Sequence, residues 1–304
     1  MKKINNKGFA ISTIIYSILI IAILIMGMLY STIAFRKKTS SDFTHKVEEQ
    51  LNNLEVKSYT ICKKATSKHQ DKYGTLINGD TLVVGAAFDC DVNGDGEFNS
   101  DSERFYYLSP ENGTSSDNIV LIYYSNTYTD AGNSITTPNN NLKIAYDEEA
   151  SSSTTNQVSP KKAKEFLPTS SELSWKNSSL IKPGTGDNQE VDIKDENGDA
   201  KVQNFSYNGY SARFPRLSEL KFALEKNTIV DPAKYNFFFE GTVVSGQTDC
   251  TEGYWIEDVS SDDKSKAWVF DAKNKKITTV LGNTNDKYGV RPVIVVNKEN
   301  VYYE

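Results

Sequence analysis

The feature that most constrains this chain is a run of twenty-seven residues, Phe9 to Phe35, that contains no charged side chain. A helix of that length spans roughly 40 Å at about 1.5 Å per residue, which is enough to cross a bilayer even when the helix is tilted. Backbone amides in lipid must be satisfied within the segment, so a lone span must be helical. The run exceeds the roughly 7 to 15 apolar residues of a cleaved secretory signal, and the basic residues 36–38 follow it. We therefore expect a retained transmembrane helix at 9–35.

A short basic leader precedes this run. Residues 1–8 read MKKINNKG and end at Gly8, and Phe9 then begins the apolar helix. This arrangement resembles a type IV prepilin or pseudopilin signal, which implies cleavage after Gly8 and methylation of Phe9. The family usually has Glu at the fifth mature position, where this chain has Thr13.

Orientation does not follow from charge, because three lysines precede the run and three basic residues follow it. The pilin resemblance implies a cytoplasmic N-terminus and a large domain outside the cell membrane. Residues 36–57 are expected to continue as an amphipathic helical stalk, since apolar residues recur at helical spacing from Phe43 to Leu54. The apolar stripe of this stalk would pack on the globular domain or on a neighbouring chain.

Residues 58–304 predict one extracytoplasmic α+β domain with an antiparallel sheet and long loops. The aromatic and β-branched runs ERFYYLS and NIVLIYYSN, separated by the turn residues PENGTSSD, predict a β-hairpin, and YNFFFEGTVV predicts a further strand at 235–244. The runs VDIKD and AKVQNF flank Asn197-Gly198 like a hairpin, and a short helix is expected to begin at Ser218 as its N-cap. The net charge of −6, without a basic stripe, argues against a nucleic-acid partner.

The C-terminal part carries a second resemblance. The segments ARFPRLSEL, GYWIEDV, KAWVF and YGVRPVIVV occur in that order between residues 207 and 298. They resemble the C-type-lectin-like fold of formylglycine-generating-enzyme-like bacterial surface domains. The resemblance implies that Trp255, Trp268 and Arg291 stabilise the fold. The copper-binding cysteine pair of those enzymes has no match here, so their oxidase activity is not expected.

An acidic segment, DCDVNGDGEFNSDSE, predicts a structural Ca²⁺ site. Oxygen-bearing side chains at alternate positions around a glycine suit a hard cation, as in the first half of an EF-hand or dockerin-type loop. Ser102 stands where an EF-hand has its bidentate acid, so Asp101 or Glu103 would have to close the site. The alternative is an Asn-Gly/Asp-Gly turn in a solvated loop. The candidate ligands are Asp91, Asn93, Asp95, Glu97, Asn99, Asp101 and Glu103.

Cysteine and histidine content leaves little room for catalysis. The three cysteines allow one disulfide, either local between Cys62 and Cys90 or from one of these to Cys250, and they also allow three free thiols. The two histidines, His45 and His69, offer neither a triad nor a zinc site. Asp195, Asn197 and Asp199 repeat the acidic spacing but are expected to form only a hairpin turn. We expect no catalytic residues.

These features together predict a non-catalytic, single-pass membrane protein of bacterial type that displays a binding or structural domain at the cell surface. Its expected partners are the lipid bilayer and either other pilin-like subunits or a surface ligand, protein or glycan. Two alternatives remain, a minor pilin or pseudopilin subunit of a filament or secretion apparatus, and an enzyme of the formylglycine-generating type.

Overall fold

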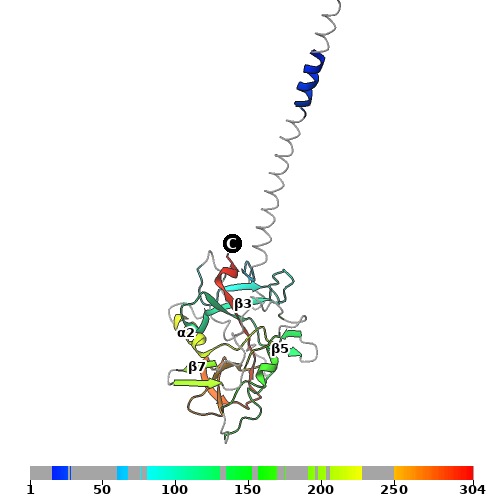
Figure 1. Cartoon of the computed structure of the whole chain (residues 1–304). Coiled ribbons are helices and arrows are strands. Elements are labelled where there is room, and N and C mark those ends of the chain that lie inside the picture. The colour runs from blue at the N-terminus through cyan, green and yellow to red at the C-terminus, as the bar shows by residue number, and fades with distance from the viewer. Residues whose placement is uncertain are drawn as a thin grey trace, which may run out of the picture. The chain divides into compact units, whose positions relative to one another are not determined.

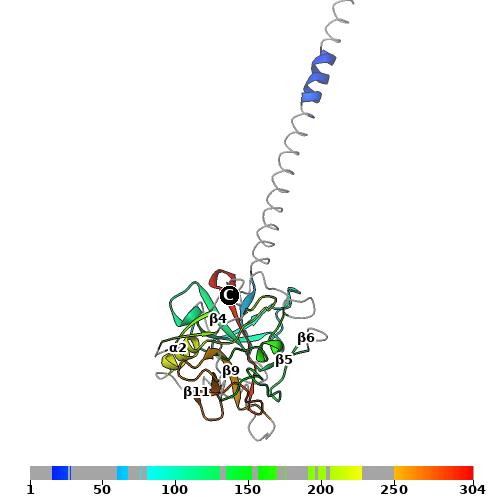
Figure 2. The same ribbon diagram turned by 60° about the horizontal axis from the view of Figure 1, so that its bottom comes forward.

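The computed structural model describes residues 16–26, 28, 60–67, 76, 81–130, 135–152, 157–169, 175, 191–195, 198–202, 206–227 and 250–303. The chain divides into two compact units, Met1–Tyr59 and Thr60–Glu304. Figures 1 and 2 show the second unit as strands of several short sheets with few helices. Its described part is therefore α+β and mostly sheet, as the sequence predicts.

The described residues of the first unit, 16–26 and 28, are helical. Their large apolar side chains are exposed on every side, from 51% at Leu19 to 68% at Met28. Within the described ranges, no helix is both long and apolar enough to cross a bilayer. The remaining residues of the predicted span 9–35, the leader 1–8 and the stalk 36–57 lie outside the described residues.

A six-stranded sheet combines strands from the start and the end of the second unit, in the order β13-β4-β3-β2-β1-β14. Its strands are β1 (Cys62–Lys64), β2 (Ala87–Cys90), β3 (Arg104–Pro110), β4 (Asn118–Tyr123), β13 (Val293–Asn297) and β14 (Val301–Tyr302). The predicted hairpin is confirmed, since β3 pairs antiparallel with β4 across the turn η1 (Glu111–Gly113). Asn112 has a φ of 59° there, as this tight turn requires.

A second sheet has the order β11-β10-β9-β12. Its strands are β9 (Gly253–Val259), β10 (Lys266–Asp271), β11 (Lys276–Leu281) and β12 (Tyr288–Gly289). The expectation of a purely antiparallel sheet is wrong at two places, because β1 pairs parallel with β14 and β12 with β9. Each is a two-residue pairing between segments joined by long connections, so no tight turn imposes an antiparallel direction.

The predicted C-terminal helix is α2 (Leu217–Asn227). Ser218 lies within its first turn, so its predicted role as N-cap is wrong. Instead, the carboxylate of Asp258 accepts the Leu217 N–H at 2.8 Å, and that of Glu219 accepts the Arg216 N–H at 2.9 Å. The second contact is half of a capping box, while the first comes from a strand 41 residues away.

Smaller elements complete the described fold. They are the hairpins β5 (Thr127–Asp130) with β6 (Ile135–Pro138) and β7 (Val191–Asp195) with β8 (Gly198–Val202), and the 3-10 turns η2 (Ala163–Phe166) and η4 (Lys298–Asn300). The β7–β8 pair confirms the predicted hairpin, whereas the expected strand at 235–244 lies outside the described residues. One apolar core lies between the six-stranded sheet and α2, and a second lies around β9 and β10.

Candidate functional site

The acidic segment is the connection between β2 and β3. Its two ends are fixed by the sheet, because Asp89 pairs with Arg104 in the strand register and the Cys90 N–H donates to the Glu103 carbonyl at 2.9 Å. Residues 91–103 therefore leave and re-enter the sheet at neighbouring positions. We call them the acidic loop.

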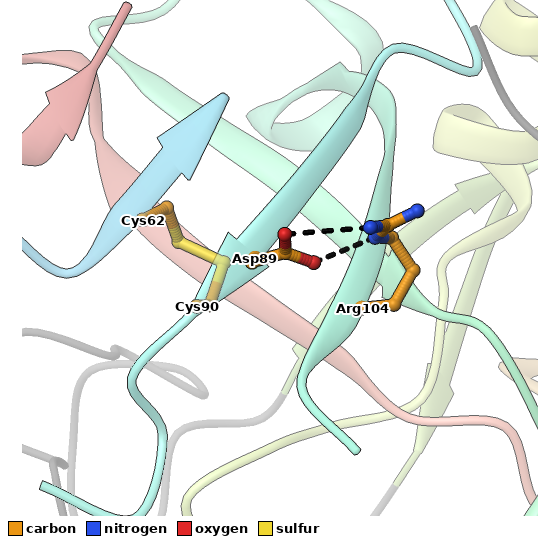
Figure 3. Close-up of a disulfide and its surroundings, with 4 residues drawn as sticks. All are labelled: Cys62, Asp89, Cys90 and Arg104. Carbon is orange, nitrogen blue, oxygen red and sulfur yellow. Dashed lines mark hydrogen bonds and ion pairs between the residues drawn. A yellow bond between two sulfur atoms is a disulfide. The ribbon is translucent and has the colours of Figure 1, made fainter. Parts of the chain in front are cut away.

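A disulfide and an ion pair lie at the base of the acidic loop (Figure 3). Cys62 of β1 is bonded to Cys90 of β2, directly before the loop begins, which is one of the pairings that the sequence leaves open. Directly after the loop, Arg104 binds the Asp89 carboxylate through Nε at 2.6 Å and Nη2 at 3.3 Å. Both loop ends are thus held in the buried sheet. Cys250 is buried and is not in a disulfide, and its thiol donates to Asn141 Oδ1 at 3.5 Å.

The first part of the acidic loop wraps around the carboxylate of Asp91. Its Oδ1 accepts the N–H groups of Gly94 at 2.7 Å and Asp95 at 3.1 Å, and its Oδ2 accepts the Gly96 N–H at 3.0 Å. Both glycines have positive φ, 73° and 82°, a conformation that side-chain-bearing residues rarely adopt. The glycines therefore allow the backbone to converge on a buried acidic side chain.

The next candidate ligands lie at the loop surface. Asn93 is half-buried, and its amide donates to Asp95 Oδ2 at 2.9 Å. Asp95 Oδ1 accepts the Glu97 N–H at 2.8 Å, and Asn99 Oδ1 accepts the Asp101 N–H at 2.9 Å. The last four of these five residues are exposed, and their hydrogen bonds are local turns.

Glu103 differs from the other acids of the loop because it is only 3% exposed. Its Oε2 accepts the Asn99 N–H at 2.9 Å, whereas its buried Oε1 has no donor in hydrogen-bond geometry within the described part of the chain. The backbone N–H of Asn93 is near enough to act on the charge of this carboxyl, but it does not form such a bond. Burial raises the pKa of Glu103 to about 7; repulsion from Asp91 and Asp95 adds to this, whereas the Asn99 and Asn93 amides oppose it. The carboxylate thus lies inside the loop, among like charges.

Two side chains from the sheet hold the outside of the acidic loop. The Tyr123 hydroxyl of β4 donates to the Ser102 carbonyl at 2.7 Å. The Lys63 ammonium of β1 lies over the Phe98 ring, 4.1 Å from its centroid. The loop is therefore fastened to strands on both sides of its base.

The acidic loop contains many side-chain oxygen atoms, but its acidic side chains do not surround a common point. Within the described ranges, no three His, Cys, Asp or Glu side chains gather closely enough to hold a metal ion by themselves. A Ca²⁺ site also uses amide and backbone carbonyl oxygens, which Asn93, Asn99 and Glu97 offer. The chemistry available is thus oxygen coordination of a hard cation.

Sequence reasoning missed a buried charge cluster at the start of α2. The Arg213 guanidinium binds both carboxylate oxygens of Glu219, at 2.5 and 3.0 Å, and both side chains are completely buried. Arg216 Nε donates to Glu257 Oε1 at 2.9 Å, and the Tyr207 hydroxyl donates to Glu257 Oε2 at 2.6 Å. The signal that could have revealed this cluster is the adjacent pair Glu257 and Asp258 in β9. The apolar residues of that strand predict burial, and a buried charge requires a partner.

Two acids of this cluster, Glu219 of α2 and Asp258 of β9, have opposite pKa shifts. Burial acts to raise the pKa of Glu219, but the charge and hydrogen bonds of Arg213, with help from Arg216, outweigh it and lower the pKa. Burial raises the pKa of Asp258 to about 8; the Leu217 amide opposes this shift and repulsion from Glu257 adds to it. The cluster links the start of α2 to β9.

The three residues expected to stabilise the fold have extensive contacts. Trp255 is fully buried, and its Nε1 donates to the Ile144 carbonyl at 2.7 Å. Arg291 is also fully buried, and its Nε donates to the Tyr123 carbonyl at 2.8 Å. Trp268 packs against the first core. Their stabilising role stays a prediction, which these contacts favour.

Comparison with known proteins adds no family or relative. No family model, curated protein or solved structure matches the chain. Function is therefore argued from the residues alone.

Proposed function

We propose that this chain is a single-pass protein, anchored by residues 9–35, that displays unit Thr60–Glu304 outside the cell membrane as a non-catalytic binding or structural domain. The observation that carries the proposal is the charge-free run itself, with the all-round exposed apolar side chains of its described helical residues. A helix that is apolar on every side requires lipid or other apolar helices around it.

The disulfide supports display outside the cytoplasm. Cys62 and Cys90 are bonded on neighbouring strands of the displayed unit. Disulfides form and persist in oxidising, extracytoplasmic compartments and are rare in the cytosol. Cysteine chemistry and the pilin-like leader thus favour the same side of the membrane for this unit.

The finer assignments rest on resemblance. The Gly8–Phe9 junction supports leader processing of the prepilin type, and the order of α2, β9, β10 and β13 supports a C-type-lectin-like arrangement. Thr13 at the fifth mature position disfavours a filament subunit, because pilins usually have Glu there. A tethered display protein is therefore the function that we favour over a filament component.

The test is fractionation of cells that express the full chain. We expect the protein to pellet with membranes, to resist alkaline carbonate, and to dissolve only in detergent. External protease should degrade the domain in intact cells. The double substitution Ile20→Asp/Ile21→Asp should release the protein, because each charge at the centre of a span costs about 3 kcal/mol.

The matched control is Asn5→Asp/Asn6→Asp, which adds the same charge in the leader and should leave the protein in the membrane. Mass spectrometry of the native N-terminus should find methylated Phe9, and an intact Met1 would refute processing. Recovery of the wild-type chain in the detergent-free soluble fraction would refute the anchor.

A further inference from the structure

We propose that the acidic loop, residues 91–103, binds one Ca²⁺ ion and that Glu103 is the carboxylate that closes the site. This inference is independent of the membrane anchor, because it concerns only residues of the displayed unit. The sequence alone left Asp101 and Glu103 as equal candidates and left a plain turn as the alternative.

The observation that points to a ligand is the Oε1 atom of Glu103. Glu103 is 97% buried, and this oxygen accepts no hydrogen bond within the described residues. A buried carboxylate oxygen without a partner is costly, and such groups in proteins are paired or coordinate metals. A cation inside the loop would supply the missing partner.

The surrounding oxygens are of the type that Ca²⁺ prefers. Asp91, Asn93 and Asp95 alternate along the chain, and Glu97 and Asn99 offer a backbone carbonyl and an amide oxygen. Ca²⁺ accepts six to eight such oxygens in flexible geometry. Asp91 accepts three backbone N–H groups, so its carboxylate is held in place within the loop.

Burial distinguishes the two candidate closing acids. Asp101 is exposed at the loop tip, whereas the Glu103 side chain is enclosed and is repelled by Asp91 and Asp95. Ser102, at the position of the usual closing acid, has its carbonyl bonded to Tyr123 of β4. Counted from Asp91, the closing carboxylate of an EF-hand loop stands at position twelve, whereas the buried carboxylate of this loop, Glu103, stands at position thirteen.

An ion held in this way would tie the start of the loop to its end. Asp91 follows Cys90 of the disulfide, and Glu103 precedes Arg104 of the buried ion pair. Ca²⁺ would thus add a third cross-link at the loop end of the β2–β3 hairpin and offset the negative charge of Asp91, Asp95 and Glu103. We expect it to stabilise the native state only, which is a linkage effect.

The experiment is thermal unfolding of the full chain in detergent, with its disulfide intact, in EGTA and in increasing CaCl₂. We expect the midpoint to rise by about 5 °C when Ca²⁺ is 100-fold above its dissociation constant. Mg²⁺ at the same concentration should have a smaller effect, because it demands octahedral geometry and gives up water reluctantly. Tb³⁺ luminescence, excited through nearby tyrosines, measures binding without reference to stability.

Glu103→Gln should abolish the calcium shift and the Tb³⁺ signal. Its matched control, Asp101→Asn, removes one charge from the same loop and should retain both. Asp95→Asn, at an exposed position that does not disturb the core, serves if Glu103→Gln fails to fold, and it should weaken binding at least tenfold. Equal midpoints in EGTA and Ca²⁺ with no Tb³⁺ signal would overturn the site. Loss of binding in Asp101→Asn but not in Glu103→Gln would overturn the assignment of the closing ligand.

Discussion

Glu103 at the end of the acidic loop and Glu219 in the first turn of α2 are buried to almost the same degree, 3% and 0% exposed, but their surroundings are opposite. Glu219 forms an ion pair with Arg213, which lowers the pKa of Glu219 against the effect of burial. Glu103 has acids as its charged neighbours, and its pKa is raised to about 7. The α2 region balances its buried charge with an arginine, whereas Glu103 has no such counterion among the described residues, which is the basis of the proposed calcium site.

This difference separates a structural cluster from a candidate binding site. Burial of a carboxylate alone does not distinguish the two, because both regions exclude solvent. The distinction lies in whether each buried oxygen has a partner among the side chains. Breaking the internal pairs should therefore unfold the α2 cluster, whereas the acidic loop should tolerate or benefit from loss of its charge.

The largest effect is expected for Arg213→Met. This change leaves the Glu219 carboxylate buried without its main counterion, and breaking a buried pair in this way costs about 3–5 kcal/mol. The loss in the free energy of unfolding is measured by urea unfolding of the full chain in detergent, monitored by tryptophan fluorescence. The double variant Arg213→Met/Glu219→Leu should recover most of it, because both charges are then absent.

Lys162→Met is the control for Arg213→Met. Lys162 pairs with Glu165 at 3.0 Å on the exposed surface, so its removal should not measurably change the midpoint. If Arg213→Met were as stable as the wild type, Glu219 would not depend on Arg213, and the contrast with Glu103 would fail.

A smaller effect is expected for Asp258→Asn, and it should depend on pH. Asp258 has a pKa of about 8 in the folded state, against about 3.9 when unfolded, so the folded state holds a proton that the unfolded state has lost. Its contribution to stability is therefore lost as the pH rises from about 4 to about 8. The neutral variant lacks this loss, so its stability relative to the wild type should rise between about pH 5 and pH 8, by about 1 kcal/mol or more.

Asp263→Asn is the control for this pH dependence. Asp263 is half-buried at the surface, and hydrogen bonds from the Ser265 hydroxyl and amide lower its pKa to about 2. It is therefore ionised in both states above about pH 5, so its variant should show a constant difference from the wild type. A constant difference for Asp258→Asn as well would mean that this acid is ionised in the fold.

Local sequence patterns predicted the elements but not the partners that lie far apart along the chain. The β3–β4 hairpin and α2 follow from aromatic runs, turn residues and helical spacing, which act within a few residues. The cap of α2 by Asp258 could not be predicted, because its partner is 41 residues away. The pairing of Arg213 with Glu219 was missed because Arg213 lies before the helix begins and Glu219 lies inside it. Helical periodicity predicts contacts only between residues of the same helix.

The candidate site was predictable to the same extent. The alternate oxygens of the acidic loop follow from spacing, because the chemistry of a hard cation sets that spacing. The choice between Asp101 and Glu103 depends on burial, which two neighbouring acids in a polar sequence do not reveal. The parallel pairings of β1 with β14 and β9 with β12 likewise arise from the path of the whole chain.

The smallest effect is expected for Glu103→Gln in EGTA, and its comparison with Glu219→Gln tests the contrast most directly. Glu219→Gln should destabilise the fold, because it weakens the only carboxylate that binds Arg213 within the described residues. Glu103→Gln should be neutral or stabilising by up to about 1 kcal/mol, because it removes a buried charge from acidic neighbours and adds an N–H donor. The exposed Glu97→Gln in the same loop is the matched control, and urea midpoints without calcium are the measurement. If Glu103→Gln lost as much stability as Glu219→Gln, the charge of Glu103 would have to be balanced by the protein itself, and the loop would no longer require an ion.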